Sequence, residues 1–248
     1  MNEKKQALKD ISKKIDLTVE GVENYSFEKP SVIIANHRCM KDIFVLPSAL
    51  PEACKIIMSS RLMWKQNSPE KMQRRKLIED SLYGIPIEVH GSKERLDIGL
   101  NMARVALSEN WSVGIFPEGA YVPGNQVYKG RTGASRILFD SKRFDNTDAN
   151  LIPVAIDYQE NISNDLDYYN FNNDSVKVTI CEPIDYDRYY YDYLESTNKQ
   201  EIKQALRAPI DIAMQSIAKV LNLPYKDEYI EIYKRDTVVL EDGSEIKI

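Results

Sequence analysis

The side chains with the clearest chemical potential lie in one short stretch between two apolar runs. His37 and Asp42 are separated by four residues, and Asn36 directly precedes the histidine. An aspartate that binds one imidazole nitrogen fixes the tautomer and leaves the other nitrogen to take a proton from a hydroxyl. This pair therefore predicts general-base chemistry, with His37 as the base and Asp42 as the residue that orients it.

The two residues can meet only if the backbone turns between them. On a continuous α-helix, positions five apart lie about 140° apart around the axis. The apolar run Val32–Ala35 is typical of a buried strand, and the segment from Asp42 to Pro51 is typical of a short helix. We therefore expect His37 at the end of a strand and Asp42 at the start of a helix.

A second polar residue follows a later apolar run. Trp111–Phe116 is typical of a strand, and Glu118 comes just after it in the sequence Phe-Pro-Glu-Gly. Ligands of an open α/β sheet bind outside the carboxyl ends of its strands. We therefore expect His37 and Glu118 to face one cleft.

Three motifs in this chain resemble those of a known family. The His-x-x-x-x-Asp motif at 37–42 is followed by Phe-Pro-Glu-Gly at 116–119 and Ile-Pro-Val-Ala-Ile at 152–156. The set resembles motifs one, three and four of the glycerolipid acyltransferases, of the 1-acylglycerol-3-phosphate acyltransferase type, over residues 30–157. The resemblance implies transfer of a fatty acyl group from acyl-CoA or acyl-carrier protein to a hydroxyl of a lysophospholipid or related lipid.

The resemblance also implies which residues contact substrate. Glu118 and Gly119 belong to the acceptor-binding motif, and we also assign Asn36 and Pro153 to the substrate site. The acceptor hydroxyl itself attacks the thioester, so neither an enzyme nucleophile nor a cofactor is needed, and the acyl donor is a co-substrate. No metal site is expected.

The sequence departs from the family pattern where arginines usually stand. Gly119 is followed by Ala120 rather than Thr-Arg, and His90 follows the apolar run at 85–89 in place of an arginine. Arginine binds phosphate through paired hydrogen bonds, so another cation must replace it if the acceptor is anionic. Our candidates for the substrate site are His90, Lys129 and Arg131; Arg136, Lys93 and Arg95 are further cations near these motifs.

Two other activities fit the same motifs. Water could replace the acceptor alcohol, which would make the protein a thioester hydrolase. The fold could also serve a non-catalytic acyl-binding protein. Cys39 lies near His37, but nothing around it indicates the lowered thiol pKa that a nucleophile needs.

Composition indicates a globular protein. The chain has 248 residues, 43% hydrophobic and 29% charged, with a net charge of -5 that gives no reason to expect nucleic acid as a partner. Three cysteines without metal spacing predict reduced thiols. No apolar stretch reaches the length of a spanning helix, and the N-terminus does not resemble a signal peptide. We expect a cytoplasmic protein, either soluble or peripheral on the inner face of the membrane.

The N-terminal segment leaves two interpretations open. Residues 2–15 are predicted to be helical, with Leu8, Ile11 and Ile15 on one stripe and lysines over the remainder. The helix could dock its stripe on the core, or it could rest on anionic lipid as a basic amphipathic helix.

Strands are predicted to alternate with helices over residues 30–157. We expect strands at 54–58, 85–89, 151–156 and 175–181, and helices at 69–82, 93–109 and from 133 to about 142, with Gly84 ending the first of these helices. This order predicts an α/β fold with a mixed or largely parallel sheet covered by helices. We expect a single domain over 1–248, comprising an N-terminal helix and strand (1–29), an α/β core (30–182) and a C-terminal extension (183–248) with a helix at 198–221 and a hairpin at 237–248.

Overall fold

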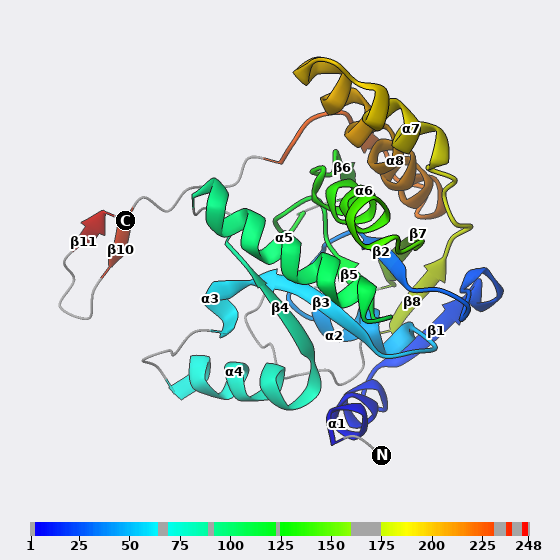
Figure 1. The fold of residues 1–248 in the computed structure, drawn as a ribbon. Helices are drawn as coiled ribbons and strands as arrows, with labels where there is room; N and C mark the ends of the chain where they lie inside the picture. The colour runs from blue at the N-terminus through cyan, green and yellow to red at the C-terminus, as the bar shows by residue number, and fades with distance from the viewer. Residues whose placement is uncertain are drawn as a thin grey trace.

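A seven-stranded sheet forms the centre of the protein (Figure 1). The computed structural model describes residues 3–63, 69–88, 92–122, 125–159, 175–230, 237–239 and 245–247. In spatial order the strands are β1 (Asp16–Glu20), β8 (Ser175–Ile180), β7 (Asn150–Tyr158), β2 (Ser31–Ala35), β5 (Ser112–Ile115), β3 (Cys54–Ser59) and β4 (Tyr83–Ile87).

The sheet is mixed and largely parallel, as the sequence predicts. Strands β7, β2, β5, β3 and β4 run parallel to one another, whereas β8 pairs antiparallel with β7 and β1 runs parallel to β8. Every residue of β2 is buried, as is usual for a strand covered on both faces. The carboxyl ends of the five parallel strands therefore meet at one edge, where both β2 and β5 lead into conspicuous motifs.

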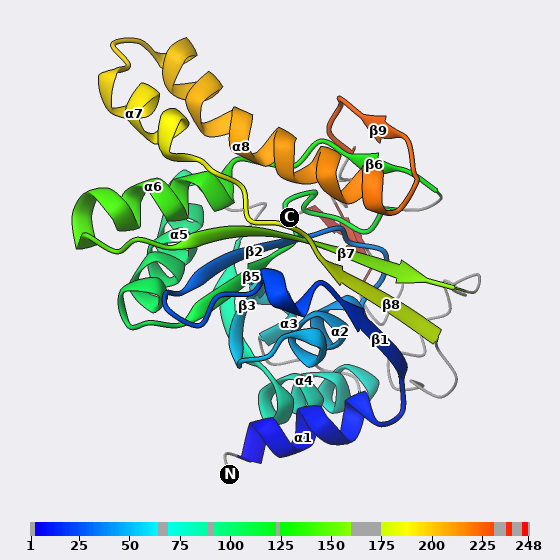
Figure 2. The ribbon, with the colours of Figure 1, turned by 90° about the vertical axis from the view of Figure 1, so that its right-hand side faces the viewer.

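Helices cover both faces of the sheet (Figure 2). On one face lie α5 (Lys93–Ser108), α6 (Gly133–Asp145) and α8 (Lys199–Val220), with α7 (Asp187–Glu195) against α8. The other face carries α1 (Glu3–Ser12), α2 (Asp42–Ala49), the short α3 (Ser60–Met63) and α4 (Pro69–Ser81). No helix in the described part of the chain combines the length and apolar character needed to cross a bilayer.

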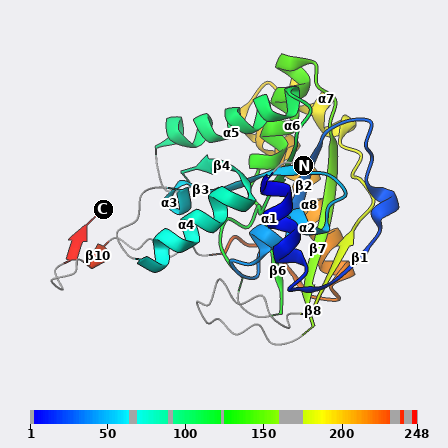
Figure 3. The same ribbon diagram turned by 90° about the horizontal axis from the view of Figure 1, so that it is seen from below.

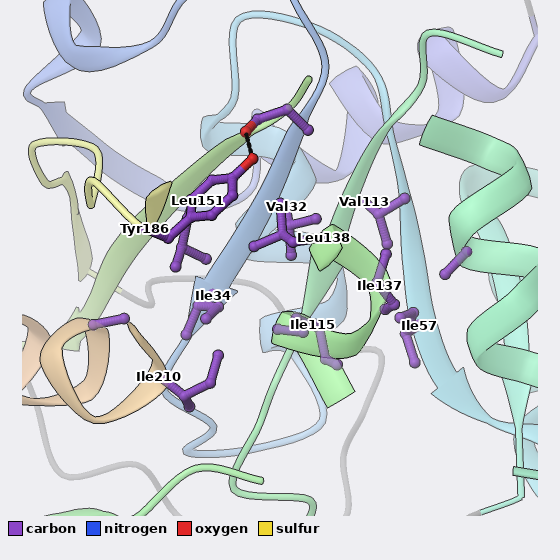
Figure 4. Close-up of a cluster of buried hydrophobic side chains, with 14 of the residues drawn as sticks. Val32, Ile34, Ile57, Val113, Ile115, Ile137, Leu138, Leu151, Tyr186 and Ile210 are labelled. Atoms are coloured by element: carbon purple, nitrogen blue, oxygen red, sulfur yellow. Dashed lines mark hydrogen bonds between the residues drawn. The ribbon is translucent and has the colours of Figure 1, made fainter. Parts of the chain in front are cut away.

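The core on the first face joins the sheet to the helices of the C-terminal extension (Figure 4). Val32 and Ile34 of β2 belong to the same buried cluster as Leu138 of α6 and Ile210 of α8. The hydroxyl of Tyr186, just before α7, donates to the backbone carbonyl of Ala149 at 2.7 Å. The extension thus packs on the same core as the sheet.

The apolar stripe of α1 is turned toward the protein. Ile11 and Ile15 are each only 6% exposed, and α1 lies beside α4 on the second face of the sheet (Figure 3). Lys4 adds two hydrogen bonds, from its ammonium to the carbonyls of Glu79 and Leu82. These contacts favour the interpretation of α1 as a helix docked on the core.

One boundary differs from the sequence-based expectation. Gly84 was expected to end the helix that begins at Pro69, but that helix ends at Ser81 and β4 begins at Tyr83, so Gly84 lies inside a strand. Its Cα is the register partner of Ile56 in β3. Pairing with a neighbouring strand overrides the usual preference of glycine for a helix end.

The extension also reaches the loop after the third motif. A short strand, β6 (Val127–Tyr128), pairs in parallel with β9 (Tyr225–Lys226), which follows α8. Farther along, β10 (Thr237–Val239) and β11 (Glu245–Lys247) pair antiparallel, which agrees with the predicted hairpin. The β6–β9 pair brings the segment just after α8 beside the loop that follows the third motif.

Candidate active site

His37 and Asp42 contact each other across the turn between β2 and α2. Nδ1 of His37 lies 2.8 Å from Oδ2 of Asp42. The backbone leaves the strand at Ala35 and enters the helix at Asp42, which gives the turn that the contact requires. Because Nδ1 is held by the carboxylate, Nε2 is the ring nitrogen that can take a substrate proton.

Asp42 is held by a set of donors from two parts of the chain. Its Oδ2 also accepts the backbone N–H groups of Arg38 at 2.6 Å and Cys39 at 2.9 Å. Its Oδ1 accepts the hydroxyl of Tyr158, the last residue of β7, at 2.7 Å. The side chain is fully buried, so these bonds replace the water that an ionised carboxylate would otherwise bind.

The imidazole of His37 is fixed by two aromatic rings. It stacks on Phe116, with centroids 4.2 Å apart and planes at 17°, and meets the edge of Tyr121 at 4.5 Å. The side chain keeps 13% of its surface exposed. A base held in one orientation and still open on one side suits proton transfer to or from a bound substrate.

Glu118 lies beneath this turn, bound to the backbone. One carboxylate oxygen accepts the backbone N–H of His37 at 2.7 Å, and the other accepts that of Tyr128 at 3.0 Å. Burial raises the pKa of Glu118 to about 7, although the two N–H groups act in the opposite direction. Its side chain is 1% exposed and does not line the cavity described below.

Asn36 and Pro153 are also enclosed by the protein. The side chain of Asn36 exchanges two hydrogen bonds with the backbone of Ile156, at 2.9 and 2.8 Å, and so joins the end of β2 to β7. Pro153 is buried within β7, where its Cα is the register partner of Ile34. Neither residue lines the cavity, although the sequence placed both at the substrate site.

A cavity of about 640 Å³ opens beside the imidazole. His37, Phe116, Gly119 and Tyr121 contribute to its wall near the motifs. A larger apolar part of the wall comes from strand ends and from α5, and includes Ile57, Met58, Ile87, Leu96, Leu100 and Ile115. The candidate base therefore borders a space in which an apolar chain can be buried.

Three arginines also line this cavity. Arg131 precedes α6, Arg136 lies within α6, and Arg207 belongs to α8 in the C-terminal extension. Among the described residues of the wall, none carries a carboxylate. Two of these arginines are also paired with carboxylates outside the wall, Arg136 with Asp97 and, at 3.5 Å, Arg207 with Asp211. The wall itself presents three arginines and no carboxylate, which favours an anionic ligand group.

Tyr229 organises two of these arginines. Its ring lies 5.3 Å from the guanidinium of Arg131 and 5.1 Å from that of Arg207. Arg207 also donates to the Tyr229 hydroxyl and to the carbonyl of Gly130. The third arginine, Arg136, is paired with Asp97 at 2.6 Å.

Lys129 and His90 were also expected from the sequence to bind the acceptor, but the described residues do not place either of them in this wall. Lys129 pairs with Asp227 of the extension and does not line the cavity. His90 lies outside the described residues. Of the three candidates chosen from the sequence, Arg131 is the one that the described residues place beside the cavity, together with Arg136, which also follows the third motif.

Comparison with known proteins identifies the family of this chain and a similar fold. Residues 16–157, more than half of the chain, match the family model described as Acyltransferase. The chain belongs to the acyltransferase family. The crystal structure of the 1-acyl-sn-glycerophosphate (LPA) acyltransferase PlsC from Thermotoga maritima has a similar fold, with a TM-score of 0.53 and 18% sequence identity over 86% of this chain and 81% of that chain. No curated protein matches the chain significantly.

Sequence reasoning missed three residues of this acyltransferase's site: Tyr158, Arg207 and Tyr229. Tyr158 stands at the carboxyl end of β7, two residues after the fourth motif, and its position at a strand end was the signal that could have found it. Arg207 and Tyr229 come from the extension, where no motif marks them. Their proximity to the cavity depends on how α8 packs.

Cys39 does not have the properties of a nucleophile in this acyltransferase. Burial and the nearby Asp42 charge raise the pKa of its thiol to about 12, so the thiolate is scarce near neutral pH. Its Sγ lies 3.3 Å from the Tyr158 hydroxyl. Within the described ranges, no group of three or more His, Cys, Asp and Glu side chains could hold a metal ion.

Proposed function

We propose that this acyltransferase moves a fatty acyl group from a thioester, acyl-CoA or acyl-carrier protein, to a hydroxyl of a lysophospholipid or related lipid. The observation that carries the proposal is the position of the His37–Asp42 pair, at a cavity whose wall combines apolar side chains with three arginines. A thioester acyl chain and a polar, anionic acceptor require these two surroundings.

His37 acts as the general base in this mechanism. Nε2 removes the proton of the acceptor hydroxyl while its oxygen forms a bond to the thioester carbonyl carbon. The tetrahedral intermediate then collapses, the C–S bond breaks, and the imidazolium returns the proton to the leaving sulfur. Proton transfer of this kind contributes roughly 10²- to 10⁴-fold to a rate.

Asp42 supports both steps without changing its own protonation state. Its bond to Nδ1 keeps the tautomer in which Nε2 accepts a proton, and its negative charge stabilises the imidazolium that forms. Glu118 and Asn36 act indirectly, because they hold the backbone on either side of the turn. We therefore assign them to positioning rather than to contact with substrate.

The apolar part of the cavity is proposed to hold the acyl chain. A volume of about 640 Å³ lies within the usual range of ligand pockets, roughly 300–1,000 Å³. Burial of each methylene contributes about 0.8 kcal/mol, so even part of a fatty chain would add substantially to binding.

The three arginines are proposed to bind a phosphate of the acceptor. They lie in the cavity wall although the family's usual arginine after Gly119 is replaced by Ala120-Tyr121. Arginine is well suited to a phosphate because its planar fork donates two parallel hydrogen bonds. The similar PlsC protein is named as an acyltransferase of 1-acyl-sn-glycerophosphate, a phosphorylated lipid, which supports a phosphorylated acceptor here. Such a lipid would bring the protein to the membrane surface.

One assay tests the reaction type. The purified protein is mixed with palmitoyl-CoA and with lysophosphatidic acid, lysophosphatidylcholine, monoacylglycerol or no acceptor, and both free CoA and lipid product are measured by mass spectrometry. Release of CoA that depends on an acceptor and matches its acylation supports the proposal. Release without an acceptor would indicate a hydrolase, and no release with palmitoyl-CoA or palmitoyl-carrier protein would indicate a non-catalytic acyl-binding protein.

A further inference from the structure

Tyr158 is the last residue of β7 and contacts the carboxylate that orients the base. Its hydroxyl donates to Oδ1 of Asp42 at 2.7 Å, whereas the His37 nitrogen and two backbone N–H groups bind Oδ2. Among the described residues, the one other group with a hydrogen bond to Oδ1 is the thiol of Cys39, whose Sγ lies 3.8 Å away. Tyr158 is therefore the principal donor to that oxygen.

We propose that Tyr158 is a positioning residue, which acts through Asp42 to set how strongly the carboxylate attracts a proton on His37. The order of contacts is Tyr158 hydroxyl, Asp42 carboxylate, His37 imidazole, with 2.7 Å and 2.8 Å between successive polar atoms. The catalytic consequence rests on the proposed function, but the contact itself can be tested without substrate. Tyr158 lies one residue beyond the segment that matches the family model.

The surroundings of Asp42 make the tyrosine a fixed neutral donor. Burial and the charge of Asp42 raise the pKa of the Tyr158 hydroxyl well above its usual range, so it stays protonated near neutral pH. Among the described residues, the other titratable or charged groups around Tyr158, Asp42 and His37 include Cys39, Arg38 and Lys41 in the turn, Glu118 after β5, and Tyr121, whose ring contacts the imidazole.

Loss of this donor has a defined electrostatic effect. A hydrogen bond to an ionised carboxylate spreads part of its negative charge onto the donor. Without the phenol, more charge remains on Asp42, and the positively charged form of His37 becomes more favourable. Proton binding at His37 should then occur at higher pH.

Histidine NMR tests this directly. The chain contains only two histidines, so ¹H–¹⁵N spectra of the imidazoles can be followed during a pH titration, with a His90→Gln sample used to assign the His37 signals. We expect Tyr158→Phe to move the His37 midpoint upward by about 0.5 to 1 pH unit. The matched control is Tyr186→Phe, which removes a buried hydroxyl bonded to Ala149 in the core cluster away from the turn. A midpoint within 0.2 pH unit of wild type, or one that moves downward, would overturn the proposal.

A second substitution keeps the proposal testable if Tyr158→Phe does not fold. Insertion of 3-fluorotyrosine in place of Tyr158 retains the shape and makes the phenol a stronger donor, so the midpoint should move downward. An upward shift or no shift would contradict the proposed linkage. With palmitoyl-CoA and an accepted lipid, the acidic limb of kcat/KM should follow the NMR midpoint in each protein. If the midpoints shift but no acyl transfer is found, the proposed function fails while the tyrosine linkage stands.

Discussion

The carboxylate of Glu118 accepts the backbone N–H of His37 at 2.7 Å. A side chain of the third motif therefore holds the backbone of the proposed general base, which belongs to the first motif. The contact joins residues 81 positions apart, and the second oxygen of Glu118 holds Tyr128 in the same way. The carbonyl of His37 in turn accepts the N–H of Val122 at 2.7 Å. These hydrogen bonds join the first motif to the third and to the loop that follows it.

Glu118 should make stability depend on pH. Its pKa is raised to about 7 in the folded protein, above the ordinary value of 4.5, so the folded state holds a proton that the unfolded state releases. The stability gained from that proton is complete below about pH 4.5 and is lost as pH rises toward 7, at roughly 1 kcal/mol per pH unit.

Denaturation in urea at pH 5 and pH 8 measures this effect. The wild type should lose more stability between the two values than Glu118→Gln, which cannot titrate. The exposed Glu182→Gln serves as the matched control and should follow the wild type. Equal losses in wild type and Glu118→Gln would show that Glu118 does not carry the titration.

Replacement of the base should abolish most of the transfer activity and leave the fold intact. His37→Gln should lower kcat for acyl transfer by about 10²- to 10⁴-fold, because no other group in the described wall of the cavity is placed to remove the acceptor proton. The measurement is CoA release with palmitoyl-CoA and the best acceptor, together with the melting temperature. Turnover within a factor of three of wild type in a folded variant would exclude His37 as the base.

Asp42 and His37 should behave as one unit. In Asp42→Asn the amide oxygen can still accept from His37 and the amide nitrogen can donate to the Tyr158 oxygen, so the turn can form without the negative charge. We expect kcat/KM to fall by about two orders of magnitude or more, and the double variant with His37→Gln to be no slower than His37→Gln alone.

A surface carboxylate provides the control for that cycle. Asp148→Asn removes contacts to Lys29 and Lys142 on the surface and should keep the wild-type rate. Additive losses in the double variant would mean that Asp42 acts on the reaction by a route that does not pass through the imidazole.

The arginines should discriminate between acceptors. Arg131→Gln and Arg207→Gln should each raise KM for lysophosphatidic acid by roughly 10- to 100-fold, the effect of one lost charge-assisted hydrogen bond, with little change for monoacylglycerol. Arg75→Gln is the control, since this arginine pairs with Glu79 on the surface of α4. Equal effects on both acceptors would place the arginines outside the phosphate site, and an effect on the KM of palmitoyl-CoA alone would assign them to the donor.

Local patterns in the sequence are sufficient for most of the secondary structure. The apolar run before His37 forms β2, and the stripe of Leu100, Ala103 and Leu107 forms the buried side of α5. The boundary at Gly84 was wrong because pairing between β3 and β4, rather than local preference, decides where that strand begins. The contact between His37 and Asp42 could also be predicted, since the strand, the turn and the helix that produce it follow one another directly over residues 31–49.

Local patterns in the sequence did not predict the hydrogen bonds that join polar residues far apart in the chain. Glu118 was expected at the acceptor, yet its oxygens bind two backbone N–H groups, and Asn36 binds the backbone of β7. Tyr158 reaches Asp42 from 116 positions away, because β7 lies next to β2 in the sheet. Strand order is a property of the packed chain, and no local pattern near Asp42 encodes it.

By itself, the sequence determined the α/β class, the turn that joins imidazole to carboxylate, and the resemblance that the family match bears out. These depend on residue types and spacings within short segments, where periodicity and turn geometry suffice. Only the tertiary structure decided that Glu118 supports the backbone, that Tyr158 binds the orienting carboxylate, and that α8 brings Arg207 to the cavity. The reason is that each of these contacts joins segments far apart in the chain, and the packing of helices and the order of strands bring them together.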